Sequence, residues 1–265
     1  MHDFALARPK TLADASAAFA SGGDAAWLAG GHTLIPAMKA RLRAPETLVD
    51  LGAVPELTGM GLLEDRLYIG AMTTHATVAN DRIIGEMIPA LAHLASLIGD
   101  PQVRGRGTLG GALANNDPAS DYPAACLALD AVIQTDRAKY AADDFFQGMF
   151  ATALADGEII VRVGFRIPVG GAYAKFRHPA SRYALAGVYV ARHAGSEVRV
   201  AVTGAGPAVF RWTEAETALT ADFSETAVAS LTLDPDDLNA DIHASAEYRA
   251  QLCRVMLVQA VRDAA

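Results

Sequence analysis

The first half of the chain alternates short apolar runs with amphipathic stretches, which predicts a mixture of strands and helices. Residues 11–20 favour a helix, because Thr11 and Asp14 form a capping-box pattern while Ala15 and Phe19 share one face. Residues 88–98 carry an apolar stripe of helical period that ends at Gly99. Strand-like apolar runs stand at residues 27–29, 48–51 and 67–69.

The second half contains four strand-like runs, and in the first of them charges alternate at Arg162 and Arg166. Such runs stand at residues 159–167, 172–177, 185–191 and 198–203. Thr213 and Glu216 indicate a capped helix, and residues 248–263 form an amphipathic one. Because Pro168 ends the first of these strands, we expect a boundary there, with one domain at 1–170 (lobes about 1–55 and 56–170) and a second at 171–265. The pattern predicts an α+β fold whose second domain has antiparallel strands covered by helices.

Residues 105–123 have neither period and are rich in Gly, Asn, Asp and Pro. The stretch therefore predicts a long loop, followed by a helix from Pro123 to Leu129. Long loops inside compact domains are usually functional.

A paired-glycine motif follows the strand at 27–29. Gly30 and Gly31 allow a sharp turn that points several amides at one spot, and Thr33 adds a hydroxyl donor. An anion such as a phosphate can approach such a turn closely. The alternative is a tight strand-to-helix turn that binds no ligand.

A second glycine motif runs from Gly105 to Gly111 and matches the dinucleotide fingerprint G-x-G-x-x-G. That fingerprint needs a strand before it and a helix after it. Here a predicted helix ends upstream at Gly99, and Pro118 interrupts the chain downstream, so we reject the Rossmann interpretation. What remains is a second anion cradle of amides and a hydroxyl, and two cradles in one domain suggest a diphosphate held from two sides.

Two carboxylates follow the second motif. Asp117 and Asp121 are costly beside a phosphate unless they accept hydrogen bonds, for example from ribose hydroxyls. Asp121 is equally suited to cap the helix that begins at Pro123, and the sequence leaves both roles open.

Composition excludes several other classes of protein. The net charge is 22 − 30 = −8, which disfavours nucleic acid and anionic membranes as partners. Cys126 and Cys253 are too few for an iron–sulfur cluster and are expected to be buried and unpaired. We see neither a signal peptide nor an apolar run of transmembrane length, so we expect a cytoplasmic protein. The scattered histidines offer no metal site, and no catalytic nucleophile or base is evident.

Several motifs together resemble a known family. The runs LAGGHTLIPAMK at 28–39, LVDL at 48–51, IGAMTT at 69–74, DPQVR at 100–104, TLGG at 108–111 and DPASDYP at 117–123 occur in the same order in the FAD-binding medium subunits of carbon monoxide dehydrogenase and xanthine dehydrogenase. The C-terminal AEYR at 246–249 and its helix resemble the end of the same subunits, so the resemblance spans nearly the whole chain.

The resemblance implies a two-lobed FAD-binding domain of the p-cresol methylhydroxylase type and a smaller C-terminal domain. It also implies a large molybdopterin subunit and a small subunit with [2Fe–2S] clusters as partners, in a dimer of heterotrimers that delivers electrons to quinone, NAD or oxygen. The residues that it assigns to FAD are Ala29, Gly30, Gly31, His32, Thr33, Leu34, Thr108, Leu109, Gly110, Gly111, Ala114, Asp117, Asp121, Ile160, Lys175 and Tyr183. Lys175 and Tyr183 match positions beside the isoalloxazine ring, although Ser181-Arg182 replaces the Gly-Asp that often precedes this tyrosine.

Three other functions compete with electron transfer by such a subunit. A self-contained flavin oxidase usually needs a larger substrate domain than residues 171–265 provide. A nicotinamide enzyme would need a strand before Gly105, and an assembly subunit that has lost FAD would not need two intact glycine motifs.

Overall fold

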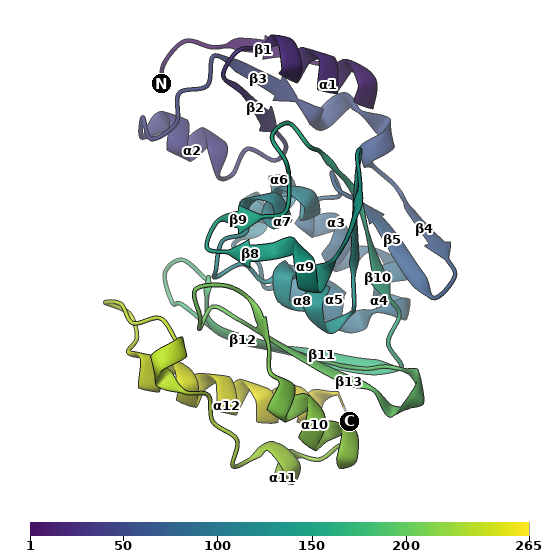
Figure 1. Cartoon of the computed structure of the whole chain (residues 1–265), viewed down its shortest axis with the longest axis vertical. Helices are drawn as coiled ribbons and strands as arrows, with labels where there is room; N and C mark the ends of the chain where they lie inside the picture. Colours follow the sequence, from purple (N-terminus) through teal and green to yellow (C-terminus); the bar gives the residue numbers. More distant parts are fainter. Residues whose placement is uncertain (265) are drawn as a thin grey trace.

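The computed structural model describes residues 1–264, whose helices and strands lie in three tiers along the long axis of the molecule (Figure 1). The mixture of helices and sheets confirms the predicted α+β class. Within residues 1–264, no helix is both long enough and apolar enough to cross a membrane.

The first tier is a sheet of three parallel strands in the order β1-β3-β2, packed against helix α1. Helix α1 begins as predicted, because the Thr11 hydroxyl accepts the amide of Asp14 at 3.1 Å. Phe19 of this helix stacks on Trp27 of β2, with ring centroids 4.3 Å apart. The elements are β1 (Ala5–Ala7), α1 (Leu12–Ser21), β2 (Ala25–Leu28), α2 (Leu34–Lys39), β3 (Thr47–Asp50) and the 3₁₀ turns Leu51–Ala53 and Pro55–Leu57.

The second tier is an antiparallel sheet in the order β4-β5-β10-β6-β7, covered by short helices. Its central strand β10 buries Val163 and Phe165 completely, and these side chains join the largest apolar core. The elements are β4 (Met60–Leu63), β5 (Arg66–Gly70), α3 (His75–Asn80), α4 (Arg82–Met87), α5 (Pro89–Ser96), α6 (Pro101–Arg106), α7 (Leu109–Asn115), α8 (Tyr122–Ala128), β6 (Val132–Thr135), β7 (Lys139–Ala141), α9 (Ala142–Phe145), β8 (Phe146–Gly148), β9 (Ala151–Thr152) and β10 (Ile160–Arg166).

The prediction of one long loop at residues 105–123 was wrong. Helix α7 occupies the middle of this stretch, and α6 ends at its start. Leu109 and Leu113, four positions apart, are both buried in the core, and Asn116 ends the helix in a left-handed conformation with φ 43°. Tertiary burial of two leucines thus outweighs the low helix propensity of the glycines between them.

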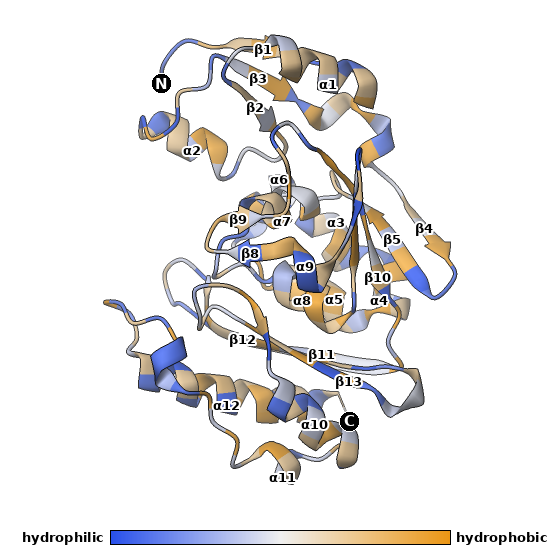
Figure 2. Cartoon of the chain, in the orientation of Figure 1, coloured by the Kyte–Doolittle hydropathy of each residue, from blue (hydrophilic) through white to orange (hydrophobic). Residues whose placement is uncertain are grey.

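The third tier is an antiparallel sheet in the order β11-β12-β13-β14 that separates two cores. Alternate residues of β12 point in opposite directions, so Tyr189 packs on the second-tier core while Val188 and Val190 pack beneath α12 and α10. Figure 2 shows hydrophilic and hydrophobic residues alternating along α12, as its predicted amphipathic character requires. The elements are β11 (Gly170–Arg177), β12 (Ala184–Arg192), the 3₁₀ turn Ala194–Ser196, β13 (Val198–Thr203), β14 (Phe210–Arg211), α10 (Thr213–Ala221), α11 (Glu225–Val228), the 3₁₀ turn Pro235–Asp237 and α12 (Ala246–Asp263).

Helix α10 begins where it was predicted, but the predicted capping box is absent from it. Thr213 is the first helical residue rather than the cap, and no side chain caps this end. The Glu216 carboxylate instead accepts the amide of Val200 at 3.0 Å and two hydrogen bonds from Arg211. The Glu216 side chain therefore bonds to residues outside the helix instead of to the start of the helix.

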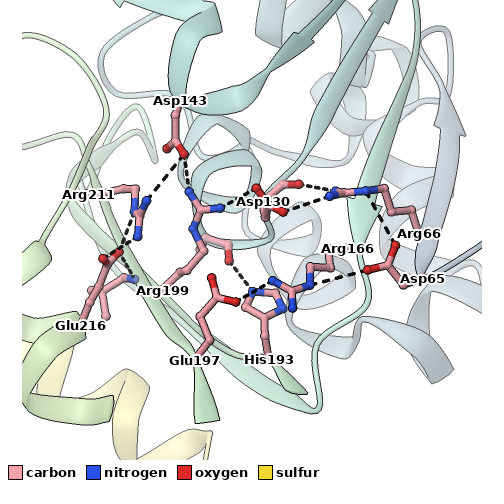
Figure 3. Close-up of polar contacts among 12 residues, drawn as sticks. Asp65, Arg66, Asp130, Asp143, Arg166, His193, Glu197, Arg199, Arg211 and Glu216 are labelled. Carbon is pink, nitrogen blue, oxygen red and sulfur yellow. Dashed lines mark hydrogen bonds and ion pairs between the residues drawn. The ribbon is translucent and has the colours of Figure 1, made fainter. Parts of the chain in front are cut away.

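Charged side chains join the second and third tiers (Figure 3). Arg199 of β13 is only 4% exposed and pairs with Asp130 at 2.6 Å and Asp143 at 2.5 Å, both of which belong to the second tier. Asp130 also accepts a hydrogen bond from Arg66 of β5 at 2.9 Å. One carboxylate thus links a strand of each sheet.

Candidate functional site

The first glycine motif forms an open turn between β2 and α2. Gly31 has φ +75°, a left-handed conformation that favours glycine, while His32 and Thr33 are exposed. Within residues 1–264, the amides of residues 30–33 donate no hydrogen bond to the protein. Leu34 opens helix α2 directly after them. The turn thus has amide donors without a protein partner, as an anion cradle requires.

The second motif differs from the first, because its amides are already paired. The Thr108 hydroxyl caps helix α7 by accepting the amide of Gly111 at 3.1 Å. The amides of Leu109 and Gly110 donate to the carbonyls of Thr73 and Ala71 at 2.9 and 2.8 Å. Buried amides need such partners, so this motif offers a ligand the Thr108 hydroxyl and a close surface rather than free amides.

The two motifs lie against each other. A β-carbon on Gly30 would collide with the carbonyl oxygen of Arg106 and lie 2.8 Å from the Cα of Gly107. A β-carbon on Gly111 would lie 3.6 Å from that of Ala29. The contact requires glycine at position 30, and it brings together two loops that lie about eighty positions apart in the sequence.

Asp121 does not cap a helix, and other side chains engage its carboxylate. It stands at the start of α8, but its side chain accepts no helix amide. Its carboxylate instead accepts a hydrogen bond from Tyr173 at 2.5 Å and pairs with the Lys175 ammonium at 2.9 Å. The two charged side chains are only 5% and 1% exposed, so Lys175 is also not the solvated lysine that its residue type suggests.

Tyr183 lies at the tip of the β11–β12 hairpin and is 50% exposed, so it is not a core tyrosine. Partial burial raises the pKa of its hydroxyl, and the negative charges of Asp117 and Asp121 raise it further. Asp117 also accepts the amide of Ala119 at 2.9 Å, which fixes the turn before α8. The exposed tyrosine therefore lies on the acidic side of the candidate site.

Two further candidates lie apart from these contacts. Ala114 is exposed near the end of α7. Ile160 begins β10, is 5% exposed and belongs to the second-tier core. Their contact with a cofactor stays a prediction.

Sequence reasoning missed two residues that shape the site. Tyr173 lies two positions before Lys175 on β11. This spacing puts both side chains on one face of the strand, so the sequence could have indicated that Tyr173 lies beside Lys175. His75 donates its amide to the Gly107 carbonyl at 2.9 Å, and its ring packs against Gly107. Burial lowers the pKa of His75 to about 4, with smaller contributions from His32 and Arg104, so the ring is neutral at neutral pH.

Comparisons with known proteins identify the family of the chain and its fold. Residues 2–169 match the family described as the FAD binding domain in molybdopterin dehydrogenase, and residues 172–264 match the CO dehydrogenase flavoprotein C-terminal domain. The nicotine 6-hydroxylase medium subunit of Paenarthrobacter nicotinovorans is 35% identical over 97% of this chain and 96% of its own length. The carbon monoxide dehydrogenase medium chain of Afipia carboxidovorans is 35% identical over 97% of this chain and 95% of its own. The structure of reconstituted CO dehydrogenase from Oligotropha carboxidovorans superposes with a TM-score of 0.92 and 33% identity, covering 99% of this chain and 98% of the other.

Proposed function

The chain belongs to the family of FAD-binding medium subunits of molybdenum hydroxylases, and on that basis we propose that it relays electrons within such a complex. A large partner subunit oxidises the substrate at its molybdopterin cofactor. Electrons then pass through the [2Fe–2S] clusters of a small partner subunit to FAD in this chain, and from FAD to an external acceptor. The complex is a dimer of heterotrimers, and this chain supplies its flavoprotein oxidoreductase subunit.

The contact between the two glycine loops carries the proposal, because it places the free amides of one loop beside the second loop, and a diphosphate site needs such donors. The unpaired amides of residues 30–33 supply N–H donors, and Thr33 adds a hydroxyl beside them. Thr108 lies on the opposing loop, whose paired amides hold it rigid. Because Gly30 has no side chain, the two loops approach each other without leaving a hydrophobic group in the way. The residues present therefore fit the cofactor that the family requires.

The chain's residues would bind and orient FAD rather than perform acid–base chemistry. The diphosphate would lie against the first loop, at Gly30, Gly31, His32 and Thr33 between Ala29 and Leu34, and against the second loop, at Thr108, Leu109, Gly110 and Gly111. The adenosine half would follow Ala114 and Asp117, and the cofactor would pack on Ile160. The isoalloxazine ring would lie beside Lys175 and Tyr183. Asp121 would act through its pairing with Lys175, which fixes the position of that ammonium. When bound, FAD supplies the ability to accept and release electrons singly or in pairs.

Flavin stoichiometry tests the proposal directly. We expect the purified chain, alone or with its partners, to release about one FAD per chain. Gly30→Ala should abolish most of this binding, because its methyl group pushes the two loops apart. Gly85→Ala is the matched control, since a β-carbon there meets nothing within 4 Å, and it should retain full FAD. Absence of flavin from both the chain and the complex would refute the proposal, as would a folded Gly30→Ala variant that keeps its FAD.

Rapid mixing distinguishes electron relay from a self-contained oxidase. The FAD-loaded chain is mixed with its reduced iron–sulfur partner, and the flavin absorbance is followed. Bleaching that depends on the partner supports the relay. Bleaching by an organic substrate in the absence of both partners would instead identify an oxidase.

A further inference from the structure

His193 connects the third tier to the second (Figure 3). It follows β12 directly and is only 1% exposed. Its ring Nε2 atom lies 2.9 Å from the carbonyl oxygen of Ala128, the last residue of α8. Because a carbonyl oxygen only accepts hydrogen bonds, Nε2 carries a proton and donates it across the junction between the two tiers.

The other nitrogen of this ring has no partner. Nδ1 is buried and makes no hydrogen bond to any residue in the range 1–264. In the neutral ring this atom is an acceptor that is left without a donor. In the protonated ring it would become an N–H donor with part of a buried positive charge, and no acceptor in that range is placed to receive it. The site therefore tolerates the neutral ring better than the charged one.

Two of the three charged side chains that act on the ring are positive. Arg166 of β10 and Arg199 of β13 face it, together with Glu197, which precedes β13. Glu197 is paired with Arg166 at 2.7 Å, so its charge is largely neutralised there. The further charged members of the same network are Asp65, Arg66, Asp130 and Asp143. A second positive charge on His193 would therefore be placed beside two arginines.

These surroundings change the affinity of the ring for a proton. Burial lowers the pKa of His193 below its ordinary value, and the charges of Arg166 and Arg199 lower it further. The hydrogen bond to Ala128 and the charge of Glu197 raise the pKa but do not outweigh the burial and the arginines. A ring that water reaches would have the ordinary pKa of about 6.5. Below that pH an open junction takes up a proton more readily than the closed one, so acid favours opening.

We propose that His193 makes the junction between the second and third tiers acid-sensitive. When Nδ1 takes up a proton from solution, the end of β12 separates from the end of α8 and water reaches the ring. The opening is local, because the buried ring of Tyr189 and the ion pairs of Arg199 hold the tiers together elsewhere. The device does not depend on FAD, so it goes beyond the proposed function.

Hydrogen exchange of the full chain at about pH 7.5 and about pH 5.5, corrected for the intrinsic effect of pH on exchange, tests the proposal. A ring that is protonated only in the open form raises the open fraction by up to about tenfold over this interval. We expect peptides covering α8 and the end of β12 to exchange at least about threefold faster at the lower pH, while peptides covering α1 do not change.

Two variants isolate the contribution of His193. His193→Gln keeps an N–H donor for the Ala128 carbonyl but does not titrate, so its junction peptides should show no increase. His93→Gln changes an exposed histidine of α5 and should respond like the wild type. The pKa of His75 is also lowered by burial, but His75 is present in every variant, so the difference between them belongs to His193.

Three results would overturn the proposal. The first is corrected exchange at the junction that does not change with pH in the wild type. The second is the same increase in His193→Gln as in the wild type. The third is an equal increase at α1, which would show that acid loosens the whole chain. If His193→Gln does not fold, the wild type still decides, because an NMR titration that protonates His193 without faster exchange at the junction also refutes the device.

Discussion

Asp130 links the second and third tiers, and removing its charge should destabilise the chain measurably. Its two carboxylate oxygens bind guanidinium groups from two sheets, Arg66 at 2.9 Å and Arg199 at 2.6 Å (Figure 3). Asp130→Asn is the cleanest perturbation, because position 130 has φ +46° and asparagine tolerates this left-handed conformation. The substitution keeps the shape of the side chain, removes its charge and replaces one of its two acceptor oxygens with an NH2 donor.

The size of the effect follows from the burial of the partners. Breaking a fully buried ion pair costs about 3–5 kcal/mol. Asp130 is 36% exposed, and Arg199 keeps Asp143 at 2.5 Å, so we expect solvent and the remaining partner to reduce the cost to about 2 kcal/mol. For a chain of this length, that corresponds to a fall of roughly 4–8 °C in the melting temperature.

The pH dependence gives a second, independent test. Burial alone would raise the pKa of Asp130, but hydrogen bonds and charges from Arg66 and Arg199 outweigh it and hold the pKa below its ordinary value. A depressed carboxyl pKa in the folded chain stabilises it fully above the ordinary pKa of about 3.9, and this contribution is lost as the pH falls through the folded value. The difference between wild type and variant should therefore be constant near neutral pH and shrink below about pH 4.

Thermal unfolding followed by circular dichroism measures both effects. The control is Glu86→Gln, which removes an exposed ion pair with Arg82 (59% and 79% exposed) and should change the melting temperature little. If Asp130→Asn behaves like this control at neutral pH, or if its deficit persists undiminished below pH 4, the assigned role of the carboxylate is wrong.

Other substitutions test the site and the core. Lys175→Met should destabilise the chain by about 3 kcal/mol in urea unfolding, because it strands the buried Asp121 carboxylate, and adding Asp121→Asn should restore part of this loss; a double variant no more stable than the single one would contradict the pairing. Burial raises the pKa of Cys253 to about 12 and that of Cys126 still further, so neither thiol should react with iodoacetamide in the native chain at neutral pH, whereas both should react in urea, as mass spectrometry will show. Gly85→Ala, in an exposed helix with open space around it, should raise stability by about 0.5–1 kcal/mol, and a loss of stability would show that the helix is strained there.

The third-tier strands were predictable because strands buried on both faces read as continuous apolar runs. The apolar residues of β12 and β13 pack on the two cores that their sheet separates, and β-branched residues favour such positions. Helix α7 was missed because its signal consists of only two leucines in a glycine-rich segment. This helix is stabilised by burial against β10 and by the Thr108 cap. A prediction from a short stretch of sequence cannot include the burial, because β10 is distant in the sequence.

The candidate site was predictable in part for a related reason. Glycine motifs can be recognised from the local sequence, because few other residues permit the turn at Gly31 or the close approach at Gly30. The pairing of Asp121 with Lys175 spans 54 positions, and no local pattern specifies it. Each residue alone has an ordinary local explanation, a helix cap or a solvated lysine, and only the packing of α8 against the third-tier sheet rules both out.

That packing makes the third tier part of the candidate site rather than an appendage. The segment between α7 and α8 is hydrogen-bonded to the end of β13. The Thr203 hydroxyl donates to the carbonyls of Pro118 and Ser120 at 3.1 and 2.6 Å, and the amide of Gly204 donates to the carbonyl of Pro118 at 2.9 Å. Asp121, which ends this segment, is held by Lys175 of β11. The segment assigned to the flavin therefore takes its conformation from strands of the other half of the chain. It follows that changes in the third tier should alter flavin affinity even where they touch no glycine loop, because they act on the scaffold that positions Asp117 and Tyr183.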